Sequence, residues 1–287
     1  MPVLEKMKNN EYPEDYLTVR LISRLAEKRF GNVFSEKVLQ SALAEEMRWL
    51  FCQMNSELRK LFFRIFVYFE LKNIFNALRF RFGGSFASED LLNNSLLSEE
   101  VKHSLVKGEK IIDIVDTVSR IFCEDDLLEM PLKEVYLKGG LKDVERHFIV
   151  SFLNNAVRKS DDKVLKLFFR FKVDERNIIT VYKALKWDIK TEIDLIDGGE
   201  VSCPLLYKIL EKRDTEGLIR ISEKFTGIVS AGRPLEDILS EGFTNRLKRV
   251  SKHVFGRILI LYYIWKLHTE ARERRKVIRG GAGYEGK

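Results

Sequence analysis

Residues Ser35–Phe82 read SEKVLQSALAEEMRWLFCQMNSELRKLFFRIFVYFELKNIFNALRFRF, with neither Pro nor Gly along the whole stretch. Pro and Gly are the residues that most often end a helix, so this stretch is predicted to be helical. We expect two helices here, the second beginning near Ser56. The complete chain of 287 residues contains only 5 Pro, which favours a mainly helical protein.

Shorter helical segments alternate with loops over the rest of the chain. Apolar spacing, acidic helix starts and Gly stops predict a short helix that begins at Ser88 and helices at Glu11–Arg29, Asp113–Phe122, Lys142–Lys159, Asp161–Phe171, Asp174–Lys186, Leu205–Lys212, Glu216–Thr226, Pro234–Glu241 and Thr244–Arg279. Loops are expected at Gly139-Gly140 and Asp197–Pro204. The sequence shows no convincing alternation of apolar and polar residues of the kind that strands require. It therefore predicts an all-α fold.

The composition excludes several classes of protein. Hydrophobic residues make up 45% of the chain, and its 20 Phe residues are typical of a folded core rather than of a disordered chain. The 3 cysteines are widely spaced and odd in number, which indicates a reducing compartment. The most apolar windows, Leu61–Phe69 and Ile258–Trp265, are shorter than the roughly 20 residues of a membrane span. We expect a protein that is made and kept in the cytoplasm.

The net charge of +7 arises from 50 Lys and Arg against 43 Asp and Glu. This small difference between two large numbers permits an acidic partner, such as nucleic acid, a lipid surface or an acidic protein, without requiring one. A basic cluster near the C-terminus consists of Arg272, Arg274, Arg275, Lys276 and Arg279. The cluster fits either an acidic partner or a solvated helical end.

A short pattern occurs three times along the chain. The copies begin at Glu70, Asp174 and Glu270 and read ELKNI, DERNI and EARER. In the first two copies an acid is followed by a base, Asn and Ile, and a second base lies six positions past the Asn. The third copy keeps the acid and both bases but lacks the Asn and the Ile. Repetition near a fixed period favours three similar helical units of about 100 residues.

Each copy places two basic residues on one face of a helix, because residues seven positions apart are separated by about two turns. The basic pairs fit contacts to a partner or salt bridges between units. A single copy alone fits an ordinary amphipathic helix with a solvated basic face. The candidate contact residues are Glu70, Lys72, Asn73, Arg79, Asp174, Arg176, Asn177, Lys183, Glu270, Arg272, Arg275 and Arg279.

The copies at Glu70–Ile74 and Asp174–Ile178 resemble segments of the C-type subunit of archaeal-type (V/A-type) rotary ATPases, a family that includes the d-type subunit of eukaryotic V-ATPases. Three more segments agree in order along the chain. Tyr16–Arg20 is similar to the family's N-terminal Tyr-x-x-x-Arg helix, Leu195–Gly199 resembles the loop that opens its last third, and Tyr263–Ile278 resembles its C-terminal helix. Each motif is short, and Glu273 stands where the family usually has Asn.

The resemblance implies an all-helical, funnel-like body of three similar lobes around a pseudo-threefold axis. With the repeat spacing, the lobes are expected at residues 1–99, 100–200 and 201–287, the last with a basic C-terminal helix and tail. A member of this family sits on the cytoplasmic mouth of the membrane-embedded proteolipid ring and receives the foot of the central stalk. It transmits torque between them and carries out no chemistry of its own.

The implied partners are the proteolipid ring and the central-stalk subunits of a rotary ATPase that transports protons or sodium ions. The membrane is reached only indirectly, so a peripheral location on its cytoplasmic face is expected. Neither nucleic acid nor a small-molecule substrate is implied. The repeated bases are candidates for stalk contact or for salt bridges between lobes.

Two other functions stay open from the residues alone. A helical nucleic-acid-binding or regulatory module could use the basic C-terminal helix, and an enzyme of unrecognised type is the third hypothesis. The 4 His residues do not lie at metal-ligand spacing. The tail Gly281–Lys287 matches phosphate-binding glycine patterns only in its letters, because no strand precedes it and no helix follows. No catalytic residue, metal or cofactor is predicted.

Overall fold

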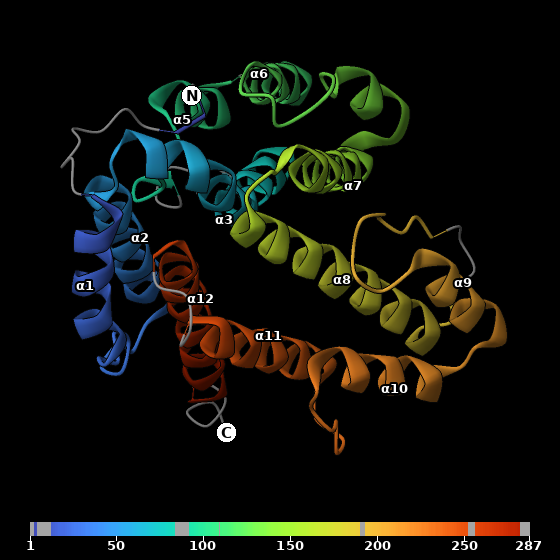
Figure 1. Ribbon diagram of the computed structural model, residues 1–287. Coiled ribbons are helices and arrows are strands. Elements are labelled where there is room, and N and C mark those ends of the chain that lie inside the picture. The colour runs from blue at the N-terminus through green and yellow to red at the C-terminus, as the bar shows by residue number, and fades with distance from the viewer. Residues whose placement is uncertain are drawn as a thin grey trace. The chain divides into compact units, whose positions relative to one another are not determined.

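The computed structural model describes residues 3–4, 13–83, 92–108, 110–189, 193–251 and 256–281. Over these ranges the regular structure consists of helices, and one isolated antiparallel bridge joins Leu4 to Leu97 (Figure 1). The predicted all-α fold is confirmed for this part of the chain. None of the described helices combines the length and the apolar character that crossing a bilayer requires.

The contacts within the chain define two compact units. Unit 1 comprises Met1–Asn155 and Lys266–Lys287, and unit 2 comprises Ala156–Trp265. Unit 1 holds α1 (Glu14–Leu25), α2 (Glu36–Gln53), α3 (Ser56–Phe82), α5 (Glu99–Lys107), α6 (Ile111–Glu124), most of α7 (Lys133–Lys159) and the last part of α12 (Arg257–Gly281). Unit 2 holds α8 (Lys163–Lys186), α9 (Cys203–Lys212), α10 (Thr215–Thr226) and α11 (Leu235–Ser251). The three lobes expected at residues 1–99, 100–200 and 201–287 stay a prediction.

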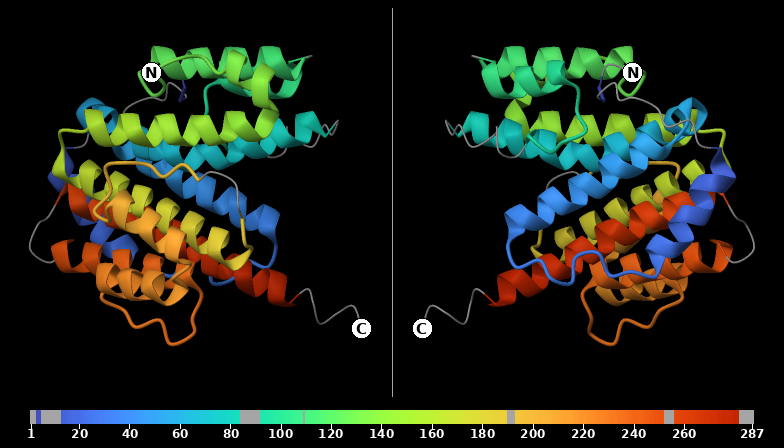
Figure 2. Two further views of the ribbon diagram at one scale, coloured as in Figure 1. Left: turned by 90° about the vertical axis from the view of Figure 1, so that its right-hand side faces the viewer. Right: turned by 90° about the vertical axis from the view of Figure 1, so that its left-hand side faces the viewer.

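Aromatic side chains fill the core of unit 1. Phe148 of α7 lies edge-on to Phe75 of α3 and to Phe122 of α6, with ring centroids 5.5 Å and 4.7 Å apart. These contacts hold α7 alongside α3, as both views in Figure 2 show. Because protein interiors pack as densely as organic crystals, a core of this kind resists deformation.

An aromatic cluster also forms the core of unit 2. Phe171 of α8 stacks on Phe243 of α11 with centroids 4.0 Å apart, and Trp265 lies edge-on to both rings. The buried ammonium of Lys172 lies 4.5 Å from the Trp265 ring centroid and 2.7 Å from a carboxylate oxygen of Glu175. The ring and the carboxylate together replace the water that burial removes from this charge.

The prediction of separate helices at Asp161–Phe171 and Asp174–Lys186 is wrong, because one helix, α8, spans both segments. The residues that connect them, Phe171, Lys172 and Val173, are all buried. The polar residues Lys172 and Asp174 interrupt the apolar pattern of the sequence at this point. The helix continues through them because the surrounding side chains pack against this turn.

The predicted long helix Thr244–Arg279 is also wrong. Its first part belongs to α11, which begins at Leu235 and ends at Ser251, and α12 starts anew at Arg257. Gly256, just before α12, has φ 89°, a conformation that a right-handed helix cannot contain.

Two further differences concern short segments. The loop expected at Gly139-Gly140 is a kink inside α7, where Gly140 has φ 69°. Helix α5 was not predicted, although Ser98 is its N-cap and accepts a hydrogen bond from the Val101 amide. The short helix expected to begin at Ser88 falls mostly outside the described residues.

Candidate functional site

The acid of the second copy, Asp174, lies in α8 and is fully buried. Its side chain binds backbone amides of the loop that precedes α9. Its two carboxylate oxygens accept hydrogen bonds from the amides of Glu200 (2.8 Å) and Val201 (2.9 Å). One turn further along α8, the Asn177 side chain donates to the carbonyl of Ile196 (2.7 Å) and accepts from its amide (2.9 Å). Loop and helix are therefore joined by four hydrogen bonds from two side chains.

Burial raises the pKa of Asp174 from its ordinary value to about 6, although the two backbone amides act in the opposite direction. Cys203 is the first residue of α9, the helix that follows this loop, and its thiol donates to the Ile196 carbonyl at 3.3 Å. Burial, reinforced by the nearby carboxylate of Asp197, raises the pKa of this thiol to about 11. A thiol with so high a pKa has little thiolate at neutral pH and is a poor nucleophile.

The acid of the first copy, Glu70, has the same role in α3. Its carboxylate accepts hydrogen bonds from the Leu96 amide (2.9 Å), the Ser95 hydroxyl (2.6 Å) and the Asn73 side chain (2.8 Å). The amides bound by the two acids, those of Leu96 and Glu200, both lie 26 residues after the acid.

In the first two copies the held loop leads directly into the next helix. Ser98 is the N-cap of α5 and Ser202 is the N-cap of α9, each two residues after the held amide. The starts of these helices, Glu99 and Cys203, are 104 residues apart, the same separation as between the two acids. We call this arrangement of acid, Asn and held loop the polar joint.

The third copy, on α12, contacts a loop from the other end of the chain. The Glu270 carboxylate accepts a 3.4 Å hydrogen bond from the Arg29 amide, and Arg274 Nε donates to the Val33 carbonyl at 2.5 Å. This loop also ends at a serine N-cap, Ser35, which begins α2. The three acids of the pattern thus all receive a backbone amide from a loop that precedes a helix.

The basic members of the pattern diverge. Arg79 donates two hydrogen bonds to Glu145 of α7, which raise the pKa of the guanidinium. Arg272 lies 3.2 Å from Glu273, its own neighbour on α12. Arg176 is half-buried and Lys183 is exposed on α8. The predicted two-base stripe therefore has no single role within the chain.

Three of the candidate bases gather around one carboxylate in unit 1. Arg279 Nε lies 2.8 Å from Glu36 Oε1, and Arg275 Nε lies 3.6 Å from the same oxygen. The hydrogen bond from Arg279 lowers the pKa of Glu36. Loss of water around the Lys72 ammonium, followed by repulsion from Arg275 and Arg279, lowers the pKa of Lys72, and Glu36 acts against this. We call these four residues the Glu36 cluster.

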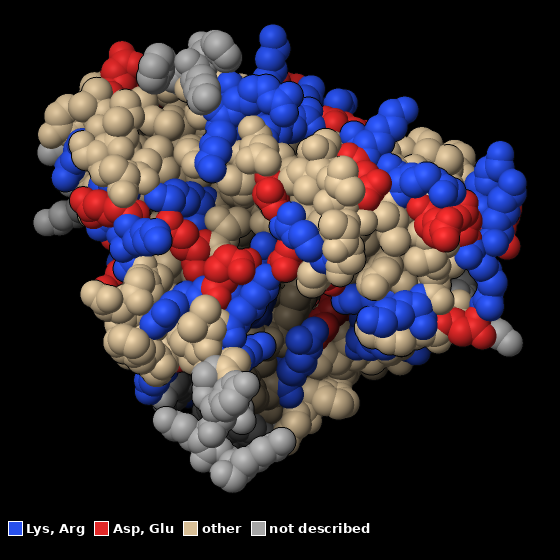
Figure 3. All heavy atoms as spheres, turned by 90° about the horizontal axis from the view of Figure 1, so that it is seen from below, with Lys and Arg blue, Asp and Glu red and all other residues tan. Residues whose placement is uncertain are grey.

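The Glu36 cluster is the candidate contact surface, since three cations there face one anion. Lys and Arg side chains are frequent on the face shown in Figure 3, with acidic side chains among them. The repeat pattern identifies Lys72 and Arg279, and the C-terminal basic cluster includes Arg275. Neither pattern identifies Glu36, which precedes all three by at least 36 positions.

The described residues hold no group of three or more His, Cys, Asp or Glu side chains that could bind a metal ion. Most of the glycine-rich tail Gly281–Lys287 lies outside the described residues. The candidate residues thus form structural polar joints and a basic surface.

Comparison with known proteins gives a family for the chain. The family profile of the ATP synthase (C/AC39) subunit matches residues 15–282, which is nearly the whole sequence. No curated protein matches. The resemblance to the C-type and d-type subunits of V/A-type ATPases is thereby confirmed. The chain belongs to the ATP synthase (C/AC39) subunit family.

Proposed function

We propose that this subunit of a rotary V/A-type ATPase is a non-catalytic rotor part that couples the central stalk to the membrane proteolipid ring on the cytoplasmic side. The observation that carries the proposal is the family match over residues 15–282. The proposal includes the ring and the stalk as partners, and the transported ion is a proton or a sodium ion.

A coupling protein must transmit torque without yielding, and the polar joints support this role. Opening the loop held by Asp174 would break two hydrogen bonds to a buried carboxylate, and hydrogen bonds to charged groups contribute about 1.5–3 kcal/mol each. The same reasoning applies to Glu70 and the loop that begins α5. Loops are usually the most mobile part of a helical protein, and here two of them are hydrogen-bonded to the long helices α3 and α8.

The polar joints also support three similar lobes, with boundaries that differ from 1–99, 100–200 and 201–287. We propose that α3 to α7 form one lobe and α8 to α11 a second. The third would combine the last part of α12 with α1 and α2, because Glu270 and Arg274 bind the loop ahead of α2. In this arrangement the lobe at the C-terminus is completed by the N-terminus.

The Glu36 cluster is proposed as a contact for an acidic segment of the stalk. Three cations around Glu36 leave an excess of positive charge, and complementary charge sets the register and orientation of a docked partner. Arg79 is assigned a structural role instead, because its charge is already matched by Glu145.

The test is affinity purification of the tagged chain from detergent-extracted membranes of its own cells. We expect the proteolipid and the stalk proteins to co-purify with it. The variant Lys72→Glu with Arg275→Glu and Arg279→Glu is expected to lose the stalk proteins, since attraction becomes repulsion.

The matched control reverses three exposed lysines of α7, Lys133→Glu, Lys138→Glu and Lys142→Glu, with the same change in net charge. It should retain every partner. If the wild-type chain purifies alone and binds RNA or DNA with a steep salt dependence, the rotor assignment is wrong and the basic helix serves nucleic acid. If the wild-type chain and the triple variant both retain every partner, the rotor assignment stands and the Glu36 cluster is not the contact.

A further inference from the structure

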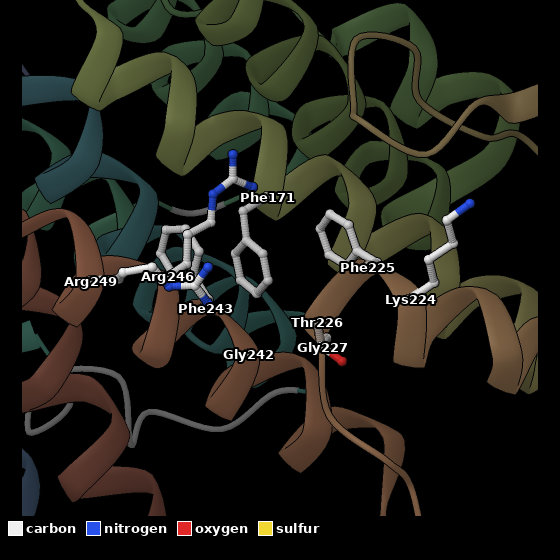
Figure 4. A pocket seen from close by; sticks show the side chains of 9 residues that line it. All are labelled: Phe171, Lys224, Phe225, Thr226, Gly227, Gly242, Phe243, Arg246 and Arg249. Carbon is white, nitrogen blue, oxygen red and sulfur yellow. The ribbon is translucent and has the colours of Figure 1, made fainter.

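Unit 2 contains a pocket of about 290 Å³. None of its lining residues belongs to the Glu36 cluster. Its lining includes three aromatic residues, Phe171, Phe225 and Phe243, and three basic ones, Lys224, Arg246 and Arg249. In Figure 4 the rings of Phe171 and Phe225 lie between Lys224 on one side and the two arginines on the other.

The aromatic part of the pocket is a stack of three nearly parallel rings. Phe171 stacks closely on Phe243, with centroids 4.0 Å apart, and faces Phe225 in a nearly parallel arrangement at the larger separation of 6.1 Å. Phe171 and Phe243 are buried in the core, whereas Phe225 is half-buried at the edge of the pocket. The stack is therefore fixed on one side and open on the other.

The basic part of the pocket is only partly neutralised. Arg246 donates two hydrogen bonds of 2.7 Å to the Glu200 carboxylate, which fixes its guanidinium beside the rings. Lys224 and Arg249 are exposed, and within the described ranges no acidic side chain forms an ion pair with either. The rim thus carries two cations available to a ligand.

The open side of the pocket favours one of two kinds of ligand. Small-molecule sites usually enclose about 300–1,000 Å³ and bury most of the ligand. This pocket, at about 290 Å³, lies at the lower end of that range and is open on one side, so it is better suited to a single anchoring side chain. Anchors of this kind at protein interfaces are most often aromatic residues or Arg, and a basic rim disfavours Arg.

We propose that this pocket docks an acidic segment of a partner protein, which inserts one aromatic side chain against Phe171 and Phe225 and places carboxylates beside Lys224 and Arg249. The inference goes beyond the proposed function, which assigns no partner to this pocket and does not depend on it.

The probe is a fluorescein-labelled peptide with the sequence Gly-Ser-Glu-Glu-Tyr-Glu-Glu-Ser-Gly, titrated with the full chain at low ionic strength and followed by fluorescence anisotropy. Two matched peptides carry Ala in place of Tyr, or Lys in place of every Glu. We expect saturable binding of the first peptide, binding about tenfold or more weaker for the Ala peptide, and none for the Lys peptide.

The paired protein variants separate the pocket from general charge. Lys224→Glu with Arg249→Glu should weaken binding about tenfold or more, because two attractive contacts become repulsive. The control, Lys208→Glu with Lys212→Glu on the exposed face of α9, makes the same charge change outside the pocket and should leave the affinity within about twofold. Both pairs change exposed residues, and far-UV circular dichroism checks that the helices persist.

Several outcomes would overturn the inference. Absence of saturable binding, equal affinity of the Tyr and Ala peptides, or equal effects of the two variant pairs each contradict it. Displacement of the peptide by ATP would assign the pocket to a phosphorylated small molecule, and displacement by a single-stranded oligonucleotide would assign it to nucleic acid.

Discussion

The buried carboxylate of Asp174 gives the chain a pH dependence whose sign is unusual for an aspartate. Burial raises the pKa of Asp174 from 3.8 to about 6, so the folded protein holds this proton more tightly than the unfolded chain does. Its contribution to stability is therefore present in full below pH 3.8 and is lost as the pH rises through 6. The interval is about 2 pKa units, and at about 1.36 kcal/mol per unit the loss amounts to about 3 kcal/mol.

The perturbation that isolates this contribution is Asp174→Asn, which removes the titration but keeps the size of the side chain. The absolute stability of the variant also contains the cost of an amide NH₂ that faces the amides of Glu200 and Val201. That cost does not depend on pH. The difference in unfolding free energy, wild type minus variant, is therefore expected to fall by about 3 kcal/mol between pH 3.5 and pH 7.

The assay is urea unfolding at a series of pH values in a Trp49→Phe background. The remaining tryptophans, Trp187 and Trp265, both lie in unit 2 and report on the unit that contains Asp174. Asp161→Asn, the same substitution at an exposed carboxylate of unit 2, is the control for the chemical change itself. If the Asp174→Asn difference stays constant or grows as the pH rises, the amides and not burial set the pKa, and the reasoning is refuted.

Three further predictions concern other contacts. Glu70→Ala should lower the unfolding free energy by about 1–3 kcal/mol in urea titrations, because the buried Leu96 amide loses its acceptor; an unchanged midpoint would contradict this. Arg79→Ala should cost no more than about 1 kcal/mol in the same assay, since the Arg79 side chain is largely exposed to water, and a larger loss would show that its pair with Glu145 is coupled to the core. Cys203 should resist iodoacetamide at pH 8 in the folded chain and react fully in urea, as mass spectrometry of tryptic peptides would show, and rapid labelling in the folded state would mean that the loop opens freely.

The helical architecture could be predicted largely from local sequence signals. The breaker-free run Ser35–Phe82 divides into α2 and α3 with the second helix beginning at Ser56, as expected. The helix boundaries that were predicted wrongly depend on contacts between residues far apart in the sequence, which a short sequence window does not contain. Lys172 looked like a polar interruption of a helix, but the ring of Trp265 and the carboxylate of Glu175 make its burial in α8 tolerable.

The candidate site was predicted only in part, because the pattern identifies residues and not their partners. Lys72 and Arg279 belong to the repeat and Arg275 to the C-terminal basic cluster, yet the carboxylate that they share, Glu36, belongs to neither pattern. The pocket in unit 2 was missed altogether. The sequence signal for it is that basic residues lie close to aromatic residues on two neighbouring helices, as Lys224 does beside Phe225. This signal is weak unless it is known that the two helices pack against each other.

The polar joint explains why the acid of the repeat is kept in all three copies while the Asn is lost from the third. A carboxylate that is shielded from water must be satisfied by hydrogen bonds, and in each copy a loop amide supplies one. In the third copy Glu273 replaces the Asn, but the neighbouring Arg274 donates to the Val33 carbonyl much as Asn177 donates to that of Ile196. The donor has moved by one position while the loop stays bound to the helix, which indicates that the constraint acts on the attachment of the loop and not on the Asn itself.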